Sequence, residues 1–153
     1  MRNISDVIEG YLKGIIDQSD QGLIEIKRSE LAEHFECVPS QINYVISTRF
    51  TLEKGYIVES KRGGGGYIRI MKVKADGQKE LFDQMLSIIG SQIAQNSASN
   101  IIERLMEEGA ISKREANLML SVIDRSVIRL PLPARDEFRA ELMMSMISAL
   151  KYR

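Results

Sequence analysis

The sequence predicts an α+β protein with a mixed amino-terminal half and an all-helical carboxy-terminal half. Short runs of alternating β-branched and aromatic residues precede residue 74, whereas four segments with apolar residues at helical spacing follow it. Asp76-Gly77 between the two halves has the composition of a linker. We therefore expect two domains, residues 1–74 and 75–153, and 153 residues suffice for two small domains.

Composition and charge restrict the class of protein. No apolar run has the length of a membrane span, no signal peptide opens the sequence, and a single cysteine, Cys37, favours a reducing cytoplasm. The net charge is zero, but residues 39–74 carry seven basic and two acidic side chains, whereas residues 1–38 carry four and eight. This local excess of positive charge indicates a binding surface for a polyanion.

The amino-terminal half contains the expected elements of a winged helix-turn-helix in their usual order. A first helix begins at a Ser5 cap, and a second begins at a Ser29 cap and ends near Glu36. Pro39 is suited to the first turn of a third helix. The remaining expected segments are a brief strand at residues 23–26, the third helix at 40–50, and a hairpin with strands at 56–60 and 67–73.

The third helix has one apolar and one polar face. At 3.6 residues per turn, its inner face contains Ile42, Val45 and Ile46. A solvated surface is the ordinary interpretation of a polar helical face, but the position of this helix before a basic hairpin favours contacts to DNA bases and phosphates. Arg49 is phased towards the buried side, so it would have to extend from the last turn or lie alongside the backbone of a ligand. The predicted DNA-contacting residues of this helix are Ser40, Gln41, Asn43, Tyr44, Ser47, Thr48 and Arg49, with Gln41 at the border of the polar face.

The hairpin tip carries two cations followed by four glycines. A phosphate-binding loop is excluded because a strand follows and no Gly-Lys-Ser/Thr ending is present. A flexible linker is less favoured because matching strand patterns flank the glycines. We expect the third helix to enter the major groove and the tip to enter the adjacent minor groove, with Arg62 attracted to its negative potential. The residues predicted to contact DNA here are Lys61, Arg62, Gly63, Gly64, Gly65 and Gly66.

The carboxy-terminal half has the pattern of a small helical bundle. Ser112 and Glu115 have the spacing of a capping box. The last helix has apolar residues around more than one stripe, and about 75 residues provide little core, so we expect the bundle to form a dimer. His34 and Cys37 are each the only residue of their kind, which is insufficient for a zinc site or a thiol nucleophile. We predict no enzymatic activity and no cofactor or metal.

Two stretches carry a resemblance to a known family. The span from Ser29 to Phe50 and the Lys61-Arg62-Gly63-Gly64-Gly65-Gly66-Tyr67 wing, followed by an all-helical half, resemble CtsR, the class-three stress gene repressors. The resemblance covers the whole chain. It implies a dimeric, cytoplasmic repressor of heat-shock genes for Clp proteases and chaperones that binds a tandemly repeated double-stranded operator. It also implies control by a protein-arginine kinase and destruction by a Clp protease.

The arginines of the head are the candidates for such a modification. Arg62, Arg28 and Arg49 are the predicted phosphoarginine sites, and Arg28 and Arg49 are also predicted phosphate clamps, although ordinary surface charge is an equally good interpretation of Arg28. A phosphoryl group would place negative charge against DNA phosphates. Ordering the glycine tip on binding would also make the complex heat-sensitive. The alternative function is a winged helix that binds protein, with the bundle as a scaffold.

Overall fold

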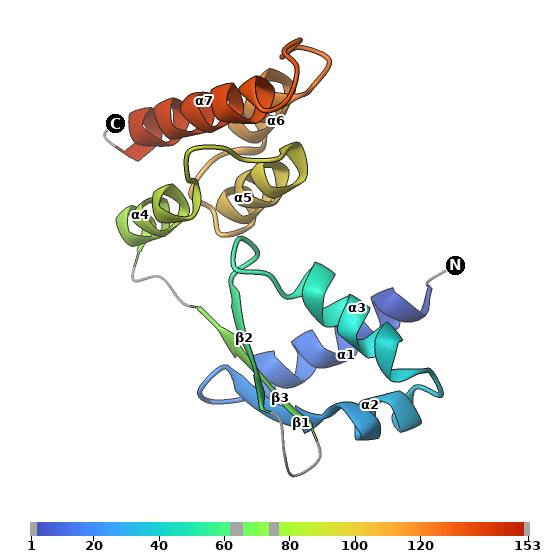
Figure 1. The fold of residues 1–153 in the computed structure, drawn as a ribbon. Coiled ribbons are helices and arrows are strands. Elements are labelled where there is room, and N and C mark those ends of the chain that lie inside the picture. The colour runs from blue at the N-terminus through green and yellow to red at the C-terminus, as the bar shows by residue number, and fades with distance from the viewer. Residues whose placement is uncertain (1–2, 62–65, 74–76, 152–153) are drawn as a thin grey trace. The chain divides into compact units, whose positions relative to one another are not determined.

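The computed structural model describes residues 3–61, 66–73 and 77–151 (Figure 1). The chain divides into two compact units, Met1–Lys74 and Ala75–Arg153. The predicted α+β fold class is confirmed: the first unit combines helices with a small antiparallel sheet, and the second contains helices without strands in its described part. None of the helices in the described ranges combines the length and the apolar character that crossing a membrane requires.

The first unit consists of three helices and a three-stranded sheet. Strand β3 is central, in the order β1-β3-β2, and pairs antiparallel with both neighbours. Ile70 lies opposite Ile24 on one side and Val58 on the other, so alternate residues of β3 face the helices. Ile68 and Ile70 are fully buried and pack with Ile8 and Leu12 of the first helix in one core. The elements are α1 (Ile4–Gln18), β1 (Leu23–Lys27), α2 (Arg28–His34), α3 (Pro39–Arg49), β2 (Tyr56–Lys61) and β3 (Tyr67–Lys72).

Two predicted helix caps are wrong. Helix α1 is capped by Asn3, whose side-chain oxygen accepts from the Asp6 N–H at 2.9 Å, while Ser5 is buried within the helix. Helix α2 begins at Arg28 without a side-chain cap, since strand β1 continues to Lys27 and passes directly into the helix. The Arg28 N–H donates to the Gly66 carbonyl at 3.3 Å, so the hairpin satisfies one backbone donor at the start of α2.

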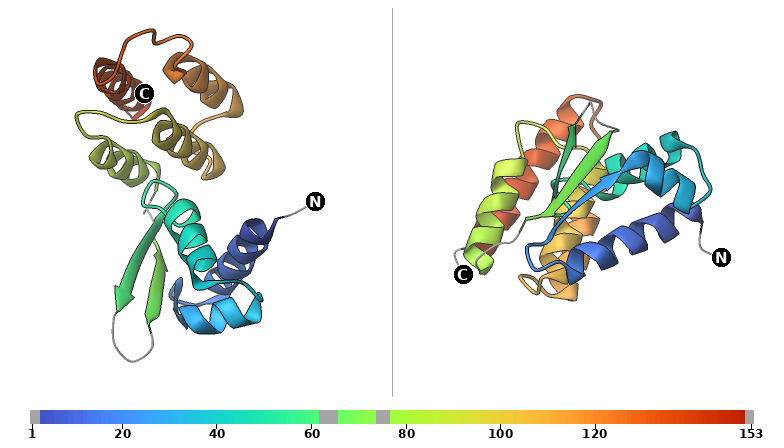
Figure 2. Two further views of the ribbon diagram at one scale, coloured as in Figure 1. Left: turned by 45° about the vertical axis from the view of Figure 1, so that its right-hand side comes forward. Right: turned by 90° about the horizontal axis from the view of Figure 1, so that it is seen from below.

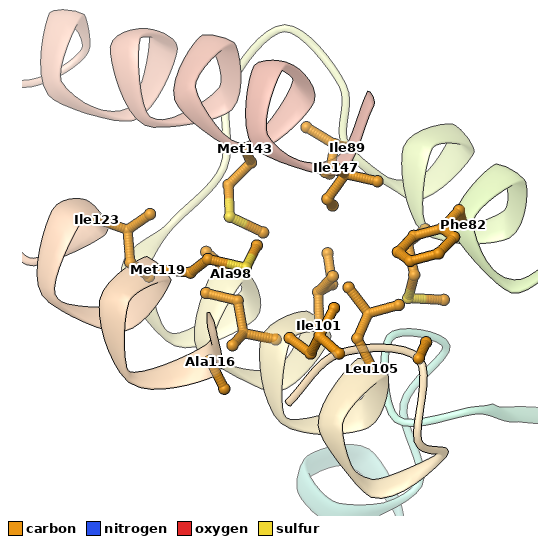
Figure 3. Close-up of a cluster of buried hydrophobic side chains, with 14 of the residues drawn as sticks. Phe82, Ile89, Ala98, Ile101, Leu105, Ala116, Met119, Ile123, Met143 and Ile147 are labelled. Atoms are coloured by element: carbon orange, nitrogen blue, oxygen red, sulfur yellow. The ribbon is translucent and has the colours of Figure 1, made fainter. Parts of the chain in front are cut away.

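The second unit is a four-helix arrangement around one apolar core (Figure 3). Met143 and Ile147 of the last helix point towards Ile101 and Leu105, and all four side chains are fully buried. The predicted capping box is confirmed: Ser112 Oγ accepts from the Glu115 N–H at 3.0 Å, and Glu115 Oε1 accepts from the Ser112 N–H at 2.8 Å. The helices are α4 (Gln78–Ile88), α5 (Gln95–Glu107), α6 (Lys113–Ile123) and α7 (Ala134–Lys151), which Figure 2 shows from two further sides.

A buried arginine joins three segments of the second unit. Arg139 is 1% exposed, and its Nε donates to the carbonyl of Ile123, the last residue of α6, at 2.8 Å. Its Nη1 donates to the Ile93 carbonyl at 3.1 Å and to Asp136 Oδ1 at 2.6 Å. A buried cation is tolerated where its donors find partners, and here Nε and Nη1 find them, whereas the buried Nη2 has no hydrogen-bond partner among the described residues. Arg139 therefore fixes α7 to the end of α6 and to the segment before α5.

Candidate nucleic-acid interface

The outer face of α3 is the polar helical surface that the sequence singled out. Ile42 and Val45 are fully buried and Ile46 is 7% exposed, as the helical phase predicted. Tyr44 is 54% exposed, so its ring lies on the outer face of the helix. Pro39 occupies the first turn, where no backbone N–H is required. The exposed polar residues of this face are Ser40, Asn43, Tyr44, Ser47 and Thr48.

Several polar groups of α3 have partners within the unit. Ser47 Oγ and Thr48 Oγ1 donate to the Tyr44 carbonyl at 3.2 and 2.6 Å, which leaves their lone pairs for donors from outside. Gln41 lies at the border of the face, as expected, and its Nε2 donates to Ser5 Oγ at 2.7 Å. The Gln41 amide is thus engaged with α1, whereas the two hydroxyl groups remain on the exposed surface.

Arg28 links α3 to the hairpin. Its Nε donates to Asn43 Oδ1 at 2.8 Å, and its Nη2 donates to Ser60 Oγ of β2 at 2.6 Å. Both partners are neutral, and within the described ranges Arg28 forms no ion pair. No described carboxylate therefore pairs with the positive charge of Arg28, which bonds to both α3 and the hairpin. Sequence reasoning selected Arg28 for its charge and missed Ser60, for which the sequence carries no signal.

Arg49 has a different environment. Its Nη1 donates to Asp6 Oδ1 at 2.9 Å and to Glu9 Oε1 at 2.5 Å, both on α1, and its side chain is 25% exposed. The hydrogen bonds to Asp6 and then Glu9 raise the pKa of Arg49 above its ordinary value. The prediction that this guanidinium extends from the last turn is wrong, because two carboxylates hold it against α1.

The sheet carries further cations in two environments. Arg69 and Lys72 of β3 face Glu25 at 3.8 Å and Asp17 at 3.6 Å, so acidic neighbours offset their charge. Lys61 is exposed beside the tip, and Lys27 Nζ lies 5.3 Å from the centre of the Tyr67 ring. Positive charge without an acidic partner is therefore concentrated at the tip end of the described hairpin.

Part of the predicted tip lies outside the described residues, namely Arg62, Gly63, Gly64 and Gly65. Gly66 is described, and its φ of 71° is one that residues with a side chain rarely adopt. An added Cβ at Gly66 would make only an ordinary contact, 3.9 Å from Arg28 Nη1, so the backbone conformation and not space requires glycine here. Glycine at position 66 thus permits the strand to begin beside Arg28.

This arrangement defines a class of protein. A polar helix follows a short turn after another helix, and Arg28 connects it to a two-stranded wing, as in winged helix-turn-helix regulators of transcription. Comparison with family models agrees with this class. Residues 3–74 match the CtsR N-terminal HTH domain, and residues 77–148 match the CtsR C-terminal dimerization domain.

The similarity extends over the whole chain. The chain is 63% identical to the transcriptional regulator CtsR of Geobacillus stearothermophilus, covering 100% of both chains. It is 56% identical to that of Bacillus subtilis strain 168, over 99% of this chain and 98% of the other. A crystal structure of CtsR in complex with a 26bp DNA duplex superposes with a TM-score of 0.93 at 63% identity, covering 99% of this chain and 100% of that chain. The chain belongs to the CtsR family of transcriptional regulators.

Proposed function

We propose that the chain is a dimeric repressor that binds a specific DNA operator, with α3 in the major groove and the wing in the adjacent minor groove. The single observation that carries the proposal is the exposed polar face of α3 beside Arg28, a cation that bonds to α3 and to the hairpin and forms no ion pair with a described carboxylate. The major groove admits an α-helix and presents a distinct pattern of donors and acceptors for each base pair. The DNA complex of the 63% identical CtsR supports this assignment.

The wing supplies the second part of the proposed site. Lys61 and Arg62 provide positive charge, and Gly63, Gly64, Gly65 and Gly66 present a backbone without side chains to a narrow groove. Arg28 adjoins the same surface. Ser40, Asn43, Tyr44, Ser47 and Thr48 provide hydrogen-bonding groups from α3, with Gln41 at their edge. Arg49, held by two carboxylates, contributes to this surface by fixing α3 to α1.

Regulation is proposed to act on the same head. The operator is a tandem repeat upstream of heat-shock genes for Clp proteases and chaperones, and release follows heat or the action of a protein-arginine kinase, with a Clp protease degrading the repressor. A phosphoryl group on Arg28 or Arg62 would replace a cation by an anion facing DNA phosphates. The same group on Arg49 would face Asp6 and Glu9, so it would repel α1 and weaken the head itself.

The proposed dimer interface lies on the second unit. Large apolar side chains are exposed on the outer sides of α6 and α7 and along the segment between them, where a solvated surface would be expected to be polar. A second copy of the chain is the partner that the match to a dimerization domain favours. The residues in question are Leu118, Val127, Leu130, Leu132, Phe138 and Met144, each at least 40% exposed.

A footprint on a duplex from upstream of a protease or chaperone gene tests the proposal. We expect the full chain to protect two adjacent segments of the duplex and Asn43→Ala to weaken this protection. Lys79→Ala is the control: it removes an exposed cation from α4 and should leave the protection unchanged. The rival function is a winged helix that binds protein. Absence of any shift of this duplex in an electrophoretic assay at low salt would favour the rival.

A further inference from the structure

The orientation of the Asn43 amide is fixed by its neighbour. A guanidinium has only donors, so the Asn43 atom that lies 2.8 Å from Arg28 Nε must be the oxygen. The amide nitrogen therefore points to the other side. Asn43 is exposed on α3, so it offers its NH2 group to a ligand while Arg28 occupies a lone pair of its oxygen. The free head thus presents a donor at this position.

We propose that Arg28 is a positioning residue that determines which base Asn43 reads. The inference rests on the proposed function. Asparagine usually selects adenine by accepting from its N6 amino group while donating to N7. With its oxygen directed towards Arg28, Asn43 instead donates to an acceptor, which guanine O6 and N7, adenine N7 and thymine O4 provide in the major groove. Arg28 thereby favours bases that present an acceptor over cytosine, which presents only its N4 donor, at one position of the operator.

A second anchor makes Arg28 a fixed reference for Asn43. The Nη2 of the same guanidinium donates to Ser60 Oγ at 2.6 Å, and the Arg28 backbone N–H donates to the Gly66 carbonyl. Ser60 lies on β2 and Gly66 directly precedes β3, so both sides of the hairpin hold the arginine. The planar guanidinium is suited to such a bridge, because its donors keep fixed angles to one another. The wing therefore sets the orientation of a side chain on α3.

The simpler role for Arg28 is a phosphate clamp, and the two roles differ in what they change. A phosphate contact raises affinity for every sequence and contributes about one to the slope of log affinity against log salt concentration. A positioning role changes the ratio of affinities for duplexes that differ at a single base pair. Discrimination between bases therefore separates the roles, because a contact to the phosphate backbone carries no direct sequence information.

The test measures binding of the full chain to the footprinted duplex and to duplexes with each base pair replaced in turn. The variants are Arg28→Ala, Asn43→Ala, their combination, and Arg28→Lys, with Lys79→Ala as the matched loss of a cation. We expect Asn43→Ala to remove roughly five- to hundredfold discrimination at one base pair. Arg28→Ala removes discrimination at the same base pair. Combining it with Asn43→Ala causes no further loss of discrimination, because both substitutions remove the same contact. Arg28→Lys keeps the salt slope but not the discrimination, because an ammonium lacks the fork that spans Asn43 and Ser60.

The following results would overturn the inference. Uniform weakening by Arg28→Ala on all duplexes, with the salt slope reduced by about one and effects that add to those of Asn43→Ala, would assign a phosphate clamp. Discrimination between bases that is unchanged in Arg28→Lys would also assign a phosphate clamp. This variant provides the test if Arg28→Ala does not fold. If the parent chain prefers no duplex, the proposed function fails together with the inference. If the parent discriminates and the arginine variants keep its preference, only the inference fails.

Discussion

Arg49 Nη1 and Glu9 Oε1 lie 2.5 Å apart and fasten the last turn of α3 to the first half of α1. Glu9 also accepts from Lys13 Nζ at 2.6 Å, and Asp6 accepts from the same Arg49 nitrogen. Burial alone would raise the pKa of Glu9, but the hydrogen bonds from Lys13 and Arg49 outweigh burial and lower it below its ordinary value of 4.5. Salt bridges on the side facing α1 thus hold α3 in place.

Arg49→Ala is expected to destabilise the head by about 1–2 kcal/mol, since charge-assisted hydrogen bonds to partly exposed carboxylates are lost. Urea unfolding measures this change. Lys13→Ala serves as the control, because it removes the more exposed partner of Glu9 and should cost less than about 0.5 kcal/mol. The salt slope of operator binding should not change. A slope reduced by about one, with unchanged stability, would instead make Arg49 a phosphate contact.

Acid should weaken the same helix pair. The folded head lowers the pKa of Glu9, so the stabilisation is fully present above about pH 4.5 and is lost as the pH falls through the folded value. Unfolding free energy measured between about pH 6 and pH 3 should therefore decline less steeply in Glu9→Gln, which has no proton to gain, than in the parent. Parallel declines in the two proteins would show that Glu9 contributes nothing to acid sensitivity.

Replacing the buried arginine of the second unit should be costly. Arg139→Met keeps much of the volume but leaves the carbonyls of Ile123 and Ile93 without their donor and Asp136 without its cation. A loss of about 2–4 kcal/mol in unfolding free energy is expected. Arg114→Ala, at an exposed position on α6, should change stability by less than about 0.5 kcal/mol. Equal effects of the two substitutions would refute the role given to Arg139.

The apolar surface of α6 provides a test of the dimer interface. Leu118→Glu places a charge on a side chain that is 67% exposed, so it should leave folding intact and shift the chain towards monomer in sedimentation equilibrium. Val38→Glu is the matched control, because Val38 is 62% exposed in the first unit and should leave association unchanged. Undiminished dimer in Leu118→Glu would place the interface elsewhere.

Arg62→Ala should weaken operator binding and reduce the salt slope by about one ion, because a cation in the minor groove displaces one counterion. Binding titrations at several salt concentrations provide the slope, with Lys79→Ala again as the control for loss of one cation. An affinity and slope equal to those of the parent would remove Arg62 from the interface.

Local pattern was sufficient to predict the α+β fold class, the hairpin and the buried face of α3, because alternation and helical phase are properties of short stretches. The roles of Arg28 and Arg49 could not be predicted in this way. Their partners, Asn43 and Ser60 in one case and Asp6 and Glu9 in the other, lie on other elements and become neighbours only through tertiary packing. The Ser29 cap failed for a related reason, since pairing with β3 extends β1 up to the helix.

Strand β1 ends at Lys27 and α2 begins at Arg28, so no loop separates the two elements that could absorb an inserted residue. One inserted residue at this joint would turn the following helix by about 100° about its axis. The Arg28 side chain, which bonds to Asn43 and Ser60, would then point away from both. Insertion libraries should accordingly show a sharp minimum of tolerance at this joint and broad tolerance between Gly90 and Gln92, which are exposed between α4 and α5.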